Sequence, residues 1–203
     1  MPEPDPTALT DILKDATPNP EPKGNVPVGM RGLNAPELRP ARGLPPVHLW
    51  NPPFCGKIDM VIKRDGSWFY MGTPINRPAM VRLFSTILRR EADGSYVLVT
   101  PVERVGIEVE DAPFIAVAVE VTRDDKGSVL SFTTNVGDIV ALGPEHELEI
   151  GTGNNPIPYI HVRAGLMARI ARPVYYELVE MGSDRDGNWS IESQGHFFAL
   201  GAL

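Results

Sequence analysis

The sequence holds one cysteine in 203 residues, Cys55, so no disulfide can form within the chain and a reducing compartment suits it best. No apolar run approaches the ~18 residues of a membrane span, so none is predicted. Basic residues are not in excess, and the net charge of −7 argues against nonspecific binding to nucleic acid or anionic membranes. The acidic, proline-rich start lacks the basic residues and apolar stretch of a secretory signal. We therefore expect a cytoplasmic protein.

Clusters of metal ligands are also missing. The four histidines are scattered with no i, i+4 pair, and Cys55 has no second cysteine beside it, so neither a metal nor a cofactor is predicted. Residues 151–155, Gly-Thr-Gly-Asn-Asn, look superficially like a phosphate-binding loop. Such a loop needs a helix directly after its glycines, and Pro156 and Pro158 argue against one, so a plain loop is predicted.

Residues 1–46 differ from the rest of the chain, because eleven of the 21 prolines fall there without a sustained apolar period. Such a segment buries too little surface to offset its conformational entropy. We interpret it as a tail with one short helix around Leu9 to Leu13. The folded part is predicted to divide into an N-terminal module, residues 47–100, and a β-rich C-terminal module, residues 101–203.

The folded part is rich in alternating apolar and polar residues, which are typical of half-buried strands. Residues 64–68 read Arg-Asp-Gly-Ser-Trp and residues 185–189 read Arg-Asp-Gly-Asn-Trp. An Asp-Gly pair between alternating stretches is a strong signal for a β-hairpin. Its occurrence once in each half predicts two related modules with the turns at equivalent places. The fold class expected is α+β, mostly antiparallel β with a few helices and an internal repeat.

Two amphipathic segments are assigned to helices. The first is capped by Asn76 with Pro78 in its first turn, and Arg77, Arg82, Arg89 and Arg90 face solvent. Its predicted buried stripe consists of Met80, Leu83, Phe84, Ile87 and Leu88. The second spans residues 166–170 and ends before Pro173, and residues 174–181 are then predicted to form a strand.

Several motifs follow one another in the order found in a bacterial family of domains of unknown function, number 1285. They are HLWNPPFCG at residues 48–56, DGSWFYMGTPI at 65–75, VRLFST at 81–86, LVTPVE at 98–103, VEDAPF at 109–114 and TNVGD at 134–138. The chain thus resembles this family over roughly residues 43–200. The resemblance implies an α+β fold with a repeated structural motif and no established activity, with a suggested role in signalling or ligand sensing.

Catalytic alternatives stay open at this point. Cys55 would need a base such as His48, His146 or His161, and the sequence around it matches no thiol enzyme. A pair among Asp59, Asp65, Asp111 and Asp138 would serve a hydrolase if two carboxylates converged. Buried thiols and aspartates in turns need no chemistry, so the structural interpretation is favoured for both.

The preferred hypothesis is a non-catalytic regulatory or ligand-sensing protein with a role in signal transduction, because the junction of two modules is a natural place for a cleft. A small hydrolase and a protein-interaction scaffold that reaches its partner through the proline-rich tail are the alternatives. The helix start offers amide donors and Arg77 a charge, so a small anion with an apolar part is the expected ligand. The candidate binding residues are Trp50, Trp68, Tyr70, Thr73 and Arg77.

Overall fold

The computed structural model describes residues 43–124, 127–151 and 157–202. The predicted helix near Leu9 and the Gly151–Asn155 loop beyond its first residue lie outside these residues. A first sheet has the strand order β3-β2-β1-β6-β5-β4. Its elements are η1 (Val47–Leu49), β1 (Phe54–Ile62), β2 (Trp68–Tyr70), β3 (Thr73–Pro74), α2 (Pro78–Thr86), β4 (Leu88–Arg90), β5 (Tyr96–Val99) and β6 (Arg104–Val109).

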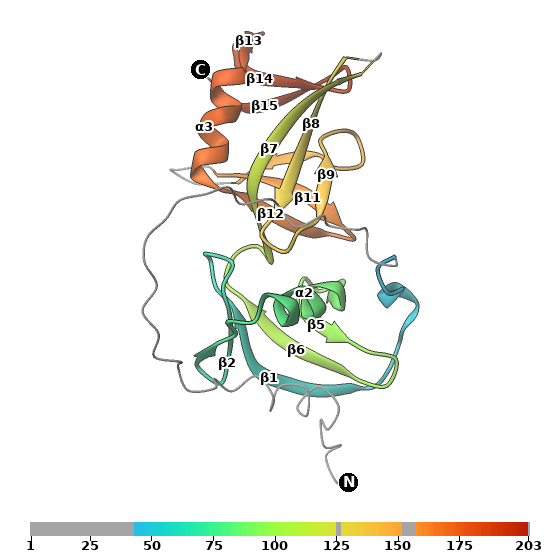
Figure 1. The fold of residues 1–203 in the computed structure, drawn as a ribbon. Coiled ribbons are helices and arrows are strands. Elements are labelled where there is room, and N and C mark those ends of the chain that lie inside the picture. Colours follow the sequence, from blue (N-terminus) through green and yellow to red (C-terminus); the bar gives the residue numbers. More distant parts are fainter. Residues whose placement is uncertain (1–42, 125–126, 152–156, 203) are drawn as a thin grey trace.

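A second sheet has the order β10-β11-β12-β7-β8-β9. Its strands are β7 (Phe114–Asp124), β8 (Gly127–Thr134), β9 (Ile139–Ala141), β10 (Leu148–Ile150), β11 (Pro158–Arg163) and β12 (Leu166–Ile170). A helix and a three-stranded sheet follow: α3 (Arg172–Met181), β13 (Ser183–Arg185), β14 (Asn188–Ser193) and β15 (His196–Ala202). Figure 1 shows the first sheet at the bottom and the second above it.

The two six-stranded sheets repeat one topology. Each consists of two three-stranded antiparallel units, and its first and last strands pair in parallel at the centre, β1 with β6 and β7 with β12. The α+β fold with two related modules is therefore confirmed. The change of sheet falls between Val109 and Phe114, further along the chain than the predicted division after residue 100.

The predicted equivalence of the two Arg-Asp-Gly-x-Trp turns is wrong. The first turn joins β1 to β2, whereas the second joins β13 to β14 in the three-stranded sheet that follows the repeat. Their backbones also differ, because Gly66 alone has a positive φ in the first turn and both Asp186 and Gly187 do in the second. The same local signal thus forms two hairpins of different type, and the repeat resides in the strand order.

Helix α2 is shorter than predicted. It begins after Arg77 with Pro78 in its first turn and ends at Thr86. Met80 and Phe84 are buried as predicted, but Leu83 is 49 % exposed. Leu88, Arg89 and Arg90 belong to β4, because the Asp93-Gly94 turn closes a hairpin in which β4 pairs with β5.

The predicted helix over residues 166–170 and strand over residues 174–181 are also wrong, since the two are exchanged. Residues 166–170 form β12, in which Leu166, Ala168 and Ile170 are buried at a spacing of two. Residues 172–181 form α3, in which Val174 and Leu178 are buried at a spacing of four. Pro173 therefore begins a helix rather than ending one, which suits its fixed φ and missing N–H.

One apolar core runs through both modules. Phe84 of α2 and Phe114 of β7 belong to the same buried cluster, and both are fully buried. Figure 1 shows α2 on the side of the first sheet that faces the second module. The modules therefore meet along α2, and this junction positions the candidate site.

No helix within the described residues is long and apolar enough to cross a membrane.

Candidate functional site

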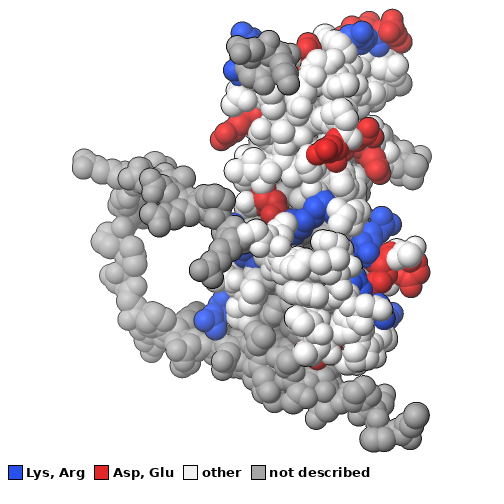
Figure 2. Space-filling model, turned by 90° about the vertical axis from the view of Figure 1, so that its right-hand side faces the viewer, with Lys and Arg blue, Asp and Glu red and all other residues white. Residues whose placement is uncertain are grey.

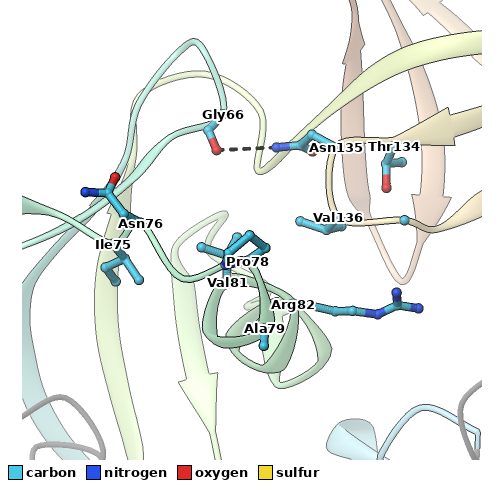
Figure 3. Close-up of a pocket in the computed structure, with 11 residues that line it drawn as sticks. Gly66, Ile75, Asn76, Pro78, Ala79, Val81, Arg82, Thr134, Asn135 and Val136 are labelled. Carbon is cyan, nitrogen blue, oxygen red and sulfur yellow. Dashed lines mark hydrogen bonds between the residues drawn. The ribbon is translucent and has the colours of Figure 1, made fainter. Parts of the chain in front are cut away.

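Asn135, in the turn between β8 and β9, ties the two modules together. Its backbone N–H donates to the Ile115 carbonyl at 2.8 Å, and its side-chain oxygen accepts from the Ile115 N–H at 3.0 Å. Its side-chain amide then donates to the Gly66 carbonyl at 3.3 Å (Figure 3). The turn of the first module is thus held directly against the second module.

Arg163 of β11 makes a second link across the junction. Its guanidinium pairs with Asp138 and donates to the Ser85 carbonyl near the end of α2 at 2.8 Å. It also lies 4.9 Å from the centre of the Phe114 ring, within the range of a cation–π interaction. Because charge-assisted bonds in a partly buried place are strong, this residue fixes the C-terminal half of α2 against the second module.

Between these two links lies a cleft of about 590 Å³. One wall comes from the start of α2 and the residues before it, and the other from the β8–β9 turn, as Figure 3 shows. Most of the side chains that line it are apolar, with Asn76, Arg82, Thr134 and Asn135 as the polar ones. The apolar side chains are those of Ile75, Pro78, Ala79, Val81 and Val136.

Arg82 is the one charged side chain on the cleft lining. Its guanidinium lies against the backbone of Gly137, where an added Cβ would come within 3.2 Å of Arg82 Nη1. Gly137 has φ +86°, so the turn itself requires glycine there. Among the described residues none forms an ion pair with Arg82, and the carboxylate of nearby Asp138 is engaged by Arg163. Within the described residues, the cleft therefore presents a positive charge that no carboxylate pairs with.

This arrangement suits a small anion. A guanidinium binds a carboxylate or phosphate through two parallel hydrogen bonds, and an apolar wall accommodates the rest of such a molecule. Figure 2 shows Lys and Arg side chains gathered on one face around the level at which the modules meet.

The five residues predicted to bind a ligand are not brought to one place. Thr73 is on β3, one edge of the first sheet, whereas Trp50 lies at the opposite edge, where its carbonyl accepts from Arg89 of β4 at 2.7 Å. Trp68 is 1 % exposed and stacks on Phe84, with 6.2 Å between the ring centres. Core packing therefore accounts for the burial of Trp68, although its buried indole N–H has no hydrogen-bond partner in the described part of the chain.

Two of the predicted residues, Tyr70 and Arg77, are near cleft residues in the sequence but do not line the cleft. Tyr70 pairs with Met60 on the face of the sheet that carries the core, and it is half-buried. Arg77 is the exposed residue that precedes α2. Neither lines the cleft, whereas Asn76 and Pro78, the two neighbours of Arg77, do.

Three of the candidate catalytic groups, Asp65, Asp138 and Cys55, have partners within the protein, whereas Asp59 is exposed on β1. Asp65 accepts hydrogen bonds from the N–H and hydroxyl of Ser67, which closes its turn and holds the pKa of its carboxyl below the ordinary value. Asp138 pairs with Arg163. Cys55 is half-buried with its thiol directed to the Pro53 carbonyl at 3.6 Å. In the described part of the chain, no three potential ligand side chains are grouped so as to hold a metal.

Asp111, in the link between the two sheets, is the centre of a further cluster. Its carboxylate accepts from the Tyr159 hydroxyl at 2.7 Å and lies near Arg169 Nε at 3.5 Å and Arg64 Nε at 3.7 Å. The Arg169 guanidinium also donates to the Arg64 carbonyl at 2.8 Å. Residues of both modules thus share one carboxylate at the point where the chain passes between them.

A pH dependence follows from this cluster. Burial raises the pKa of the Tyr159 hydroxyl, and its hydrogen bond to Asp111 adds to the rise. Because folding raises this pKa, the folded protein favours the neutral Tyr159 hydroxyl. The stability that this hydroxyl contributes is present below the tyrosine pKa of the unfolded chain, about 10, and is lost as the pH rises above that value. Tyr159→Phe should flatten this decline. Urea unfolding across that alkaline range measures it, and parallel curves for the variant and the parent would contradict it.

Sequence reasoning missed the residues that join the modules. The sequence gives Arg163 no role, and it offers residues 134–138 only as a family motif with Asp138 as a candidate acid, because partners in another module leave no local signal. Arg82 was placed on the exposed face of its helix, and its spacing along α2 agrees with that. Only the position of the second module makes it part of a cleft.

Two family models match the chain. "Domain of unknown function (DUF1285), N-terminal domain" matches residues 45–112, and "Protein of unknown function (DUF1285), C-terminal domain" matches residues 113–200. The boundary between the two matches falls in the link between β6 and β7, where the chain passes from one sheet to the other.

Two solved structures are similar to the chain. A DUF1285 family protein from Silicibacter pomeroyi DSS-3 is 54% identical, with a TM-score of 0.75 over 80% of this chain and 90% of that one. A DUF1285 family protein from Shewanella baltica OS155 is 28% identical, with a TM-score of 0.48 over 60% of this chain and 90% of that one. No curated protein matches the chain.

Proposed function

The chain belongs to the DUF1285 family, as its sequence motifs indicate, and we propose that it is a non-catalytic ligand-sensing protein of the cytoplasm. Its ligand is a small carboxylate or phosphate compound with an apolar part, bound in the cleft between the modules. The observation that carries this proposal is the Arg82 guanidinium, which lies on an otherwise largely apolar cleft without an ion-pair partner among the described residues.

The position of the cleft supports a sensing role. Its walls come from α2 of the first module and from the β8–β9 turn of the second, so one molecule in it contacts both. A ligand shifts a conformational equilibrium only through contacts that differ between the states. Bridging two modules provides such contacts, because any change in their separation changes the fit of the ligand. A protein partner would then recognise one of the two arrangements.

The surroundings of the candidate acids support a binding role over a hydrolytic one. Asp65, Asp111 and Asp138 each have a partner within their own turn or across the junction. None of the three lines the cleft. A ligand in the cleft thus meets an arginine, amide groups and a hydroxyl, which are groups that bind and orient an anion.

A thermal-shift screen of small anionic metabolites tests the proposal, with Arg82→Gln as the informative variant. We expect at least one carboxylate or phosphate compound to raise the melting temperature of the parent protein. Removing the charge of one bidentate contact should weaken its binding by ~10–100-fold, since a hydrogen bond to a charged group contributes about 1.5–3 kcal/mol.

Arg123→Gln is the matched control, because Arg123 is an exposed arginine of β7 that does not line the cleft. It should bind the same compound with unchanged affinity. The proposal fails if the compound binds Arg82→Gln and Arg123→Gln equally well, or if no anionic compound raises the melting temperature of the parent.

A further inference from the structure

A second cavity lies wholly in the C-terminal module. Its volume is about 430 Å³, and it is formed by the first turns of α3 together with the adjoining ends of β11 and β12. It shares no lining residue with the junction cleft. The residues that line it are Ile157, Pro158, Arg169, Ile170, Arg172, Tyr175 and Tyr176.

The cavity carries more positive than negative charge. Arg169 and Arg172 both line it, and no acidic residue does. Arg169 shares the Asp111 carboxylate with Arg64, so one carboxylate faces two guanidinium groups. In the described part of the chain, Arg169 Nε is buried and makes no hydrogen bond, although Asp111 lies 3.5 Å away. The Arg169 guanidinium is thus only partly satisfied by Asp111, and the part of it that lines the cavity together with Arg172 faces an anion there.

The remaining surface of the cavity suits a flat ring. Tyr175 and Tyr176 lie side by side, with 6.3 Å between their ring centres and 44° between their planes. Tyr176 is 57 % exposed, so its ring is accessible to a ligand. Ile157, Pro158 and Ile170 add apolar side chains to the lining.

From this combination we infer a second ligand site that binds an aromatic ring bearing a carboxylate or phosphate group. The anionic group contacts Arg169 and Arg172, and the ring packs against the tyrosines and the apolar side chains. Such a ligand competes with Asp111 for Arg169, whose guanidinium also holds the Arg64 carbonyl in the β1–β2 turn. A ligand that moves Arg169 would therefore also affect the β1–β2 turn, which contributes Gly66 to the junction cleft.

Phenyl phosphate and benzoate are the probes, and calorimetric titration of the full chain is the measurement. We expect both probes to bind more tightly than inorganic phosphate, which has no aromatic ring, and than phenol, which has no carboxylate or phosphate group. Arg172→Gln and Tyr176→Ala should each weaken binding of phenyl phosphate by about fivefold or more. Both residues are exposed, so these substitutions leave the core intact.

Arg123→Gln is the control and should bind phenyl phosphate as the parent does, because Arg123 lines neither cavity. The inference is overturned if Arg172→Gln binds phenyl phosphate as tightly as the parent, or if neither probe binds at millimolar concentration. It is also overturned if Arg82→Gln abolishes binding while Arg172→Gln does not, since the probe would then occupy the junction cleft. Because the two sites share no residue, failure here leaves the test of the proposed function unaffected.

Discussion

Gly66→Ala is expected to lower the free energy of unfolding by ~2–5 kcal/mol. This value adds the cost of a left-handed backbone at alanine to the cost of an overpacked contact. Gly66 has φ +81°, and a Cβ there would lie 2.7 Å from Asn135 Nδ2 and 2.8 Å from Ile115 Cγ1. Both atoms belong to the second module, so the methyl group separates the modules at the link that Asn135 makes. Chemical denaturation followed by tryptophan fluorescence measures the loss.

Gly187→Ala is the matched control, since Gly187 occupies the same position in the second Arg-Asp-Gly-x-Trp turn. Its φ is +80°, but no atom lies within 4 Å of the Cβ that would be added. Only the cost of the left-handed backbone applies, about 1–2 kcal/mol. Equal losses for the two variants would show that contact across the junction contributes nothing at Gly66.

Phe84→Ala is expected to destabilise the protein by ~3–5 kcal/mol, the usual result of truncating a buried aromatic residue. Phe84 is fully buried, stacks on Trp68 and belongs to the core shared by both modules. A cavity at this position weakens the packing of α2 on the first sheet. The same denaturation experiment measures the loss.

Leu83→Ala provides the comparison within the same helix. The sequence pattern assigns Leu83 and Phe84 to one buried stripe, but Leu83 is 49 % exposed. We expect a loss below about 1 kcal/mol, because a substitution at an exposed position removes little packing. A loss at Leu83 as large as that at Phe84 would contradict the orientation of α2 described here.

Local turn chemistry made the hairpins predictable from the sequence. Asp65 and Asp93 each accept two hydrogen bonds from a serine two residues later, which is the mechanism by which Asp-Gly pairs form turns. The parallel pairings between β1 and β6 and between β7 and β12 could not be predicted, because strands so far apart in the chain share no local signal. The pentapeptides are therefore not the basis of the repeat, which the family resemblance also implies and which lies in the strand order.

The exchange of helix and strand after residue 165 has a physical reason. Leu166 to Ile170 is a short apolar run, which fits either period equally well. Pairing with β7 and β11 on its two sides decides in favour of the strand, since both neighbours supply backbone hydrogen bonds. Val174 and Leu178 then pack as one face of a helix, although β-branched and aromatic residues favoured a strand there.

Asn76, predicted to cap α2, precedes the observed N-cap residue Arg77 and lies on the cleft lining. The start of α2 could be selected from the sequence, because a helix start with an adjacent arginine has recognisable chemistry. The opposite wall could not, since Thr134 to Gly137 reaches α2 only through the packing of the two modules. For the same reason Arg82, rather than Arg77, is the arginine on the cleft.

Chemical-shift mapping by ¹H–¹⁵N NMR tests the central claim most directly, using the anionic compound that raises the melting temperature most. If the junction cleft is the binding site, the amide signals of Ala79 and Arg82 in α2 and of Asn135 and Gly137 in the facing turn should shift together during the titration. These shifts should disappear in Arg82→Gln and persist in Arg123→Gln. Shifts confined to one module, or unchanged in Arg82→Gln, would contradict a ligand held between the two modules.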